Sequence, residues 1–136
     1  MNNIEIYTAV CPRNQDLVFP DFKIGKLKLA RHLGITQEIG SLLVSPDFAK
    51  QLLLKMPSPL ESRRVPIYVC SCCSDLGCGA TTVEVVETDF SFIWRKFGQE
   101  SNWQKGLFQS EYMKRTGEFE FDKELYISTL QPYTKK

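Results

Sequence analysis

Alternating and continuous apolar runs predict four longer strands in this chain. Residues 4–10 combine isoleucines with β-favouring residues, and residues 65–70 are apolar on both faces, as in a strand covered from both sides. Alternation of apolar and polar residues continues over residues 80–87 and over residues 90–97. Together with residues 65–70, these two runs predict an antiparallel meander.

Two details of the alternation bear on the shape of the sheets. Phe90, Phe92 and Trp94 are spaced two residues apart, so they are expected on one face of their strand. Between residues 22 and 29 the alternation changes phase at Gly25, which indicates a turn or a bulge.

Helical spacing and capping residues predict two helices. Residues 46–56 follow Ser45, which can act as an N-cap, and carry apolar side chains every four residues. The second helix is predicted from Asp122, as its cap, to Leu130. A short alternating strand at residues 119–121 leads into it.

Two segments lack a clear periodicity. Residues 30–44 fit helical spacing only if Gly34 and Gly40 are tolerated, and residues 98–117 are expected to form a long loop or a loop with a short helix. The whole pattern predicts an α+β fold, with residues 1–136 as a single domain containing a mainly antiparallel sheet and two or three helices.

The composition and charge of the chain restrict the binding partners and the cellular location that the sequence predicts. The 136 residues include 17 Lys plus Arg against 16 Asp plus Glu, and the densest basic run, from Lys23 to Arg31, suits the solvated side of one element. This balance argues against nucleic acid or an anionic membrane as a partner. The first residues lack the pattern of an export signal, and no apolar run is long enough to cross a bilayer. We therefore expect a cytoplasmic protein.

The residues of the sequence most suited to metal binding or redox chemistry are its cysteines. Four of the five lie within nine residues, from Cys70 to Cys78, and an odd number in an unexported chain favours reduced thiols or a metal over disulfides. Cys70 and Cys73 form a C-x-x-C pair, and Cys78 adds a third thiol, so these three would ligate zinc if zinc is bound. The pattern offers no fourth ligand, and the residues after Cys73 favour a turn over the helix that activates redox pairs. Zinc binding, thiol redox chemistry and plain packing of reduced cysteines stay open.

The other residues support no specific reaction. His32 is the only histidine, and its sequence surroundings suit an ordinary, partly exposed side chain. The chain has no phosphate-binding glycine loop and no H-E-x-x-H motif. No catalytic residues and no required cofactor are therefore predicted.

The cysteine turn also carries a family resemblance. Residues 68–79, YVCSCCSDLGCG, followed by WRKFG at 94–98 and FEFD at 119–122, resemble a group of small uncharacterised bacterial proteins with a Y-V-C-x-x-C-x-D-x-G-C-G turn. Cys72 is not part of the shared pattern, and Ser74 replaces a glycine. The resemblance implies a bacterial cytosolic protein, and immunity proteins of toxin systems are the interpretation we favour for it.

Two hypotheses from different classes follow. The first is a non-catalytic partner-binding protein, and within that class an immunity protein that neutralises a cognate toxin domain by forming a direct complex. It depends on Trp103, Phe108 and Tyr112, which lie among charged residues as the core and rim of protein interfaces do. The ordinary alternative for these aromatics is that they cover the sheet. The second hypothesis is a small zinc-binding or thiol-redox module that uses the Cys70–Cys78 cluster.

Overall fold

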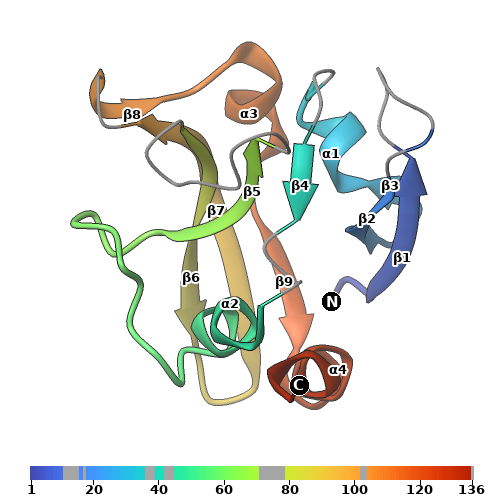
Figure 1. The fold of residues 1–136 in the computed structure, drawn as a ribbon. Helices are drawn as coiled ribbons and strands as arrows, with labels where there is room; N and C mark the ends of the chain where they lie inside the picture. Colours follow the sequence, from blue (N-terminus) through green and yellow to red (C-terminus); the bar gives the residue numbers. More distant parts are fainter. Residues whose placement is uncertain are drawn as a thin grey trace.

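Antiparallel strands form two sheets that face each other across the core, with helices packed around them (Figure 1). The computed structural model describes residues 1–10, 16, 18–35, 39–41, 45–70, 79–101 and 104–135. The α+β class with antiparallel sheets is therefore confirmed. The small sheet has the order β1-β2-β3 and consists of β1 (Ile4–Val10), β2 (Val18–Ile24) and β3 (Leu27–Lys28).

The larger sheet is built on the predicted meander. Its strands are β4 (Ile39–Ser41), β5 (Val65–Cys70), β6 (Ala80–Glu87), β7 (Ser91–Ser101), β8 (Gln104–Phe108) and β9 (Phe119–Asp122). The order is β4-β5-β6-β7-β8, and β9 pairs with the first residues of β7 while β8 pairs with the last ones. The strands β5, β6 and β7 are successive antiparallel neighbours, as expected.

The prediction of a long loop over residues 98–117 is wrong in most of its length. Strand β7 continues to Ser101, β8 follows, and only the short helix α3 matches the expectation. The strand pattern is hidden in the sequence because Gly98 interrupts the apolar alternation, while Leu107 of β8 supplies the side chain that packs over that glycine.

Four α-helices and a short 3-10 helix are present in the described part of the chain. They are α1 (Leu29–His32), α2 (Pro46–Leu52), α3 (Glu111–Thr116), α4 (Lys123–Leu130) and the 3-10 helix η3 (Gln131–Thr134). Asp122 caps α4 as predicted, since its carboxylate accepts from the Leu125 N–H at 3.1 Å. Helix α2 ends earlier than predicted, and the Ser45 side chain makes no capping hydrogen bond.

The start of β7 corrects a second expectation. Phe92 and Trp94 share the buried face of the strand, but Phe90 lies in the preceding turn and is 78% exposed. The turn is fixed by Thr88, whose hydroxyl accepts from the N–H groups of Phe90 and Ser91, at 3.3 and 2.9 Å. Phe90 therefore precedes the first residue of the strand and does not share its buried face.

Trp94 lies at the centre of the core between the two sheets. Its ring is 5.1 Å from that of Phe22 in the small sheet, 5.3 Å from Phe121 in β9 and 6.1 Å from Tyr126 in α4, measured between centroids. The indole N–H donates to the Tyr126 hydroxyl at 2.9 Å, and that hydroxyl donates to the Leu52 carbonyl at 2.6 Å. One buried chain of hydrogen bonds thus connects β7, α4 and α2.

Replacing Tyr126 with phenylalanine is expected to lower the free energy of unfolding by about 1–3 kcal/mol. The substitution keeps the ring but removes the hydroxyl, which leaves the indole N–H of Trp94 and the Leu52 carbonyl buried without their partner. Urea unfolding followed by circular dichroism measures the change. Tyr133→Phe is the matched control, because the Tyr133 hydroxyl has no hydrogen bond within the described residues; equal losses in both variants would contradict the assignment.

Candidate functional site

Two of the three aromatics expected at a partner interface are exposed and lie within five residues of each other in the chain. Phe108 ends β8 and is 47% exposed, and Tyr112 in α3 is 61% exposed. Leu107, at 39% exposed, joins them. Figure 1 shows β8 and α3 next to each other at one end of the molecule. We call Leu107, Phe108 and Tyr112 the apolar ridge; Trp103, the third predicted residue, lies outside the described residues.

Two residues of the apolar ridge pack closely against glycines. A Cβ added to Gly34 would lie 2.6 Å from Cδ2 of Tyr112, so the tyrosine ring rests directly on the backbone at the end of α1. A Cβ added to Gly98 would lie 2.4 Å from Cδ1 of Leu107. One side of each residue is therefore packed while the other faces outward, which fixes the orientation in which it is presented.

Polar groups hold and surround the apolar ridge. The Gln109 side chain donates to the Phe97 carbonyl at 2.8 Å, and the Ser110 hydroxyl caps α3 by accepting from the Met113 N–H at 3.2 Å. Glu111 and Lys114 form an exposed ion pair at 3.8 Å on the same helix. An exposed apolar centre with charged neighbours is the usual composition of a protein interface.

The cysteine cluster is described only at its first residue. Cys70 ends β5, where its backbone pairs with Ile39 of β4. Cys73 and Cys78 lie outside the described residues, so the predicted zinc site stays a prediction. Within the described ranges, no group of three or more His, Cys, Asp or Glu side chains is placed to hold a metal ion.

Asp21 is a buried acid that the sequence pattern did not single out. It lies in β2 with 1% of its surface exposed, and its carboxylate accepts hydrogen bonds from four donors. The N–H of Phe22, at 2.7 Å, and the Tyr68 hydroxyl donate to Oδ1. The Tyr7 hydroxyl, at 3.1 Å, and the N–H of Ala30, at 3.5 Å, donate to Oδ2. These donors occupy the lone-pair positions of both oxygens.

Strand register explains how this network forms. Tyr7 and Asp21 are directly opposite each other in the β1–β2 ladder, so their side chains project from the same face. Helix α1 begins after Lys28, which has no side-chain acceptor, and Asp21 supplies one to the N–H of Ala30 in the first turn. Tyr68 reaches the same carboxylate from β5 and thereby connects the two sheets.

Burial sets the protonation states in the network. Loss of solvent raises the pKa of Asp21 above its ordinary 3.8, while the four hydrogen bonds act in the opposite direction. Burial and the nearby Asp21 charge raise the pKa of Tyr7 to about 12, and the same causes raise the pKa of Tyr68 well above its ordinary value. Both hydroxyls therefore keep their protons at neutral pH and act as donors to Asp21.

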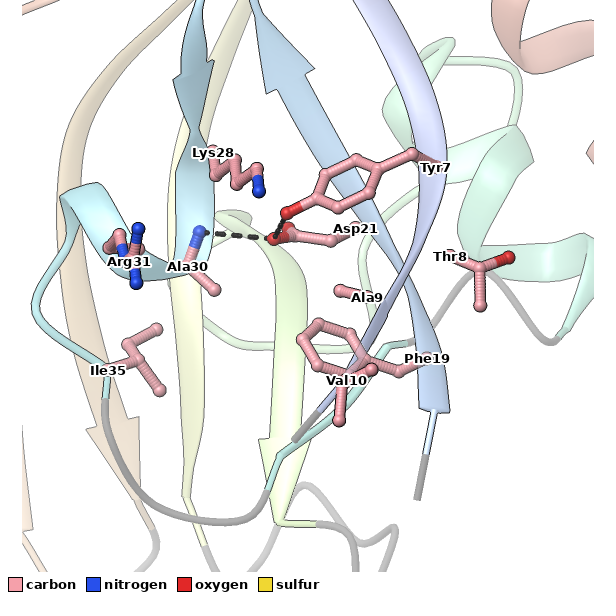
Figure 2. A pocket seen from close by; sticks show the side chains of 10 residues that line it. All are labelled: Tyr7, Thr8, Ala9, Val10, Phe19, Asp21, Lys28, Ala30, Arg31 and Ile35. Carbon is pink, nitrogen blue, oxygen red and sulfur yellow. Dashed lines mark hydrogen bonds between the residues drawn. The ribbon is translucent and has the colours of Figure 1, made fainter. Parts of the chain in front are cut away.

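A cavity of about 590 Å³ opens beside this network, between β1, β2 and α1 (Figure 2). Lys28 and Arg31 lie on its α1 side, and the Lys28 ammonium is 5.8 Å from the centre of the Tyr7 ring. Its apolar lining consists of Ala9, Val10, Phe19, Ala30 and Ile35. Figure 2 shows Lys28 and Tyr7 towards one end of the cavity and Val10, Phe19 and Ile35 towards the other.

A signal for this site is present in the sequence. Asp21 lies between Phe19 and Phe22, and a charged residue inside an apolar strand is informative because such residues are rarely buried without partners. The charge pattern alone places Lys28 and Arg31 in a solvated basic run. Both are exposed, and both also border the cavity.

Comparison of the chain with family models, characterised proteins and solved structures gave no match. In the part of the chain that the structure describes, no helix combines the length and the apolar character needed to span a membrane. The candidate function therefore depends on the apolar ridge and the cavity.

Proposed function

We propose that this chain is a non-catalytic bacterial partner-binding protein, and within that class an immunity protein that neutralises a cognate toxin domain by direct complex formation. The apolar ridge carries the proposal. Three large apolar side chains are exposed within six residues, Leu107 to Tyr112, where a folded chain would otherwise favour polar ones. Such residues are the anchors of protein interfaces, with aromatics prominent among them.

The way the apolar ridge is built supports a binding role. Tyr112 and Leu107 rest on Gly34 and Gly98, so their positions are set before a partner arrives. Ordering flexible side chains costs roughly 0.5–1.5 kcal/mol each on binding, and side chains that are already packed on one side avoid much of that cost. Strand β8 is also the last strand in the order of the large sheet, which leaves an edge for contact.

The charge of the chain limits the kind of toxin. An inhibitor of a strongly basic nuclease profits from an acidic face that accelerates encounter. This chain has a formal net charge of +1, and the helix beside the apolar ridge carries both signs, in Glu111 and Lys114. The proposed partner is therefore a toxin domain with an apolar contact surface and mixed charges around it.

The test is complex formation with the toxin-sized protein encoded beside this chain. We expect the two proteins to co-purify as a one-to-one complex and the chain to protect cells that express the toxin. Phe108→Ala and Tyr112→Ala should each weaken the purified complex by about 2 kcal/mol or more, which is roughly thirtyfold in Kd. Isothermal titration calorimetry measures this change.

Phe90→Ala is the matched control. Phe90 is also an exposed aromatic, but it lies in the β6–β7 turn, at the opposite end of β7 from β8. Its removal should leave the Kd unchanged. Failure of any adjacent toxin to bind, or equal losses in all three variants, would refute the proposal. Stoichiometric zinc in protein purified without chelator, lost together with stability in Cys73→Ser, would favour the zinc-binding alternative instead.

A further inference from the structure

The cavity beside Asp21 has one polar end and one apolar end. Its volume of about 590 Å³ is within the roughly 300–1,000 Å³ of ordinary ligand sites. Such sites combine apolar walls with a small number of placed polar groups. Here Phe19 and Ile35 supply buried apolar wall, and Lys28 and Arg31 supply exposed cationic groups next to it.

The buried carboxylate is not the group that a ligand would meet. Each oxygen of Asp21 already accepts two hydrogen bonds, so the acid has no acceptor position left for an incoming amine or hydroxyl. Asp21 acts instead by positioning: it holds the Tyr7 hydroxyl of β1, and it accepts from the Ala30 N–H in the segment that presents the cations.

The cations of the cavity are available for a ligand. Within the described residues, the ion pairs connect Glu84, Glu87 and Glu111 to other side chains, and none includes Lys28 or Arg31. The Lys28 ammonium is held over the face of the Tyr7 ring. Lys28 and Arg31 are three residues apart in one segment and both border the cavity, so a carboxylate in the cavity would meet two cations that make charge-assisted hydrogen bonds.

We infer that this cavity binds a small organic carboxylate with an apolar body. The carboxylate lies between Lys28 and Arg31, and the apolar body extends along Phe19 towards Val10 and Ile35, as the arrangement in Figure 2 indicates. None of the apolar-ridge residues lines this cavity, and the inference does not depend on the proposed immunity function.

Octanoate is a suitable probe, with octan-1-ol as the neutral ligand of equal chain length. Titration of the full chain, followed by calorimetry and by ¹H–¹⁵N NMR, is expected to give a Kd below about 1 mM for octanoate. Octan-1-ol should bind at least about tenfold more weakly, because it lacks the charge-assisted contacts. The amide signals that move should include those of Tyr7, Phe19 and Ile35.

A double variant and a control variant test whether Lys28 and Arg31 hold the carboxylate. Combining Lys28→Gln with Arg31→Gln should weaken octanoate at least about tenfold and leave octan-1-ol unchanged. Lys26→Gln is the matched control, since Lys26 is an exposed lysine of the β2–β3 turn that does not line the cavity. Equal binding of acid and alcohol, an unchanged double variant, an equal loss in the control, or signal changes confined to residues 107–112 would each overturn the inference.

Discussion

Asp21→Leu is expected to lower the free energy of unfolding by about 3–5 kcal/mol. Leucine has a comparable size but accepts no hydrogen bond, so the N–H of Phe22 and the hydroxyl of Tyr68 would stay buried without an acceptor. Tyr7 and the first turn of α1 would lose their common partner as well. Urea unfolding at neutral pH, with a two-state fit, measures the loss.

Paired substitutions separate the hydrogen bonds from a simple change of shape. Asp21→Asn keeps an acceptor and should lose less than Asp21→Leu. Adding Tyr68→Phe to Asp21→Leu should recover part of the lost stability, because the buried hydroxyl that has no acceptor is then removed as well. Strictly additive losses in the double variant would show that the Tyr68 hydroxyl and the Asp21 carboxylate do not interact.

Asp21 should make the free energy of unfolding depend on pH, and Asp21→Leu should remove this dependence. Burial raises the pKa of Asp21 above 3.8, so in the pH interval above 3.8 the folded chain retains a proton that the unfolded chain has released. The stabilisation that comes from this retained proton is fully present below that interval and is lost as pH rises through the folded-state pKa, in addition to the contribution of the hydrogen bonds to Asp21. Asp21→Leu should lack this decline, and unfolding measured between pH 3.5 and about 7 tests it.

The elements that the sequence predicts well are those with a strong local pattern. The meander of β5, β6 and β7 follows from a continuous apolar run in β5 and alternating patterns in β6 and β7, and α4 follows from Asp122 and the spacing behind it. Strand β8 escapes prediction because Gly106 breaks its pattern and Gly98 breaks that of its neighbour β7, and because residues 106–108 are exposed and mark no buried face. Its place is decided by pairing with β7, which is a tertiary contact.

The two candidate sites differ in how far the sequence could predict them. Phe108 and Tyr112 stand out in the sequence as aromatics among charges, and the structure leaves both exposed. The glycines under the apolar ridge are set by tertiary contacts that no local pattern contains: Gly34 is far in the chain from Tyr112, and Gly98 meets Leu107 through the pairing of β7 with β8. The cavity likewise depends on the register that sets Tyr7 opposite its acid partner in β2, and on a tyrosine of β5 reaching over from the other sheet.

Trp94→Ala is expected to lower the free energy of unfolding by about 3–5 kcal/mol, the usual cost of removing a large aromatic ring from a packed core. Trp94 is fully buried and contacts rings from three other elements, so the space it leaves is bounded by groups that are fixed elsewhere. Phe22 would lose its ring contact with Trp94 across the two sheets, and the Tyr126 hydroxyl would lose the indole N–H that donates to it. A domain of this size has roughly 5–15 kcal/mol of stability in total, so the loss is a large fraction of it.

Two further variants show whether the lost ring contacts cause this destabilisation. Trp94→Phe keeps a ring between the sheets and should lose less than the alanine variant, by an amount nearer to that of Tyr126→Phe, because both remove the same buried hydrogen bond. Phe90→Ala removes an exposed aromatic from the turn that precedes the same strand and should change stability by no more than about 0.5 kcal/mol. If Trp94→Ala unfolded at the same urea concentration as Phe90→Ala, Trp94 would not be the residue that joins the two sheets.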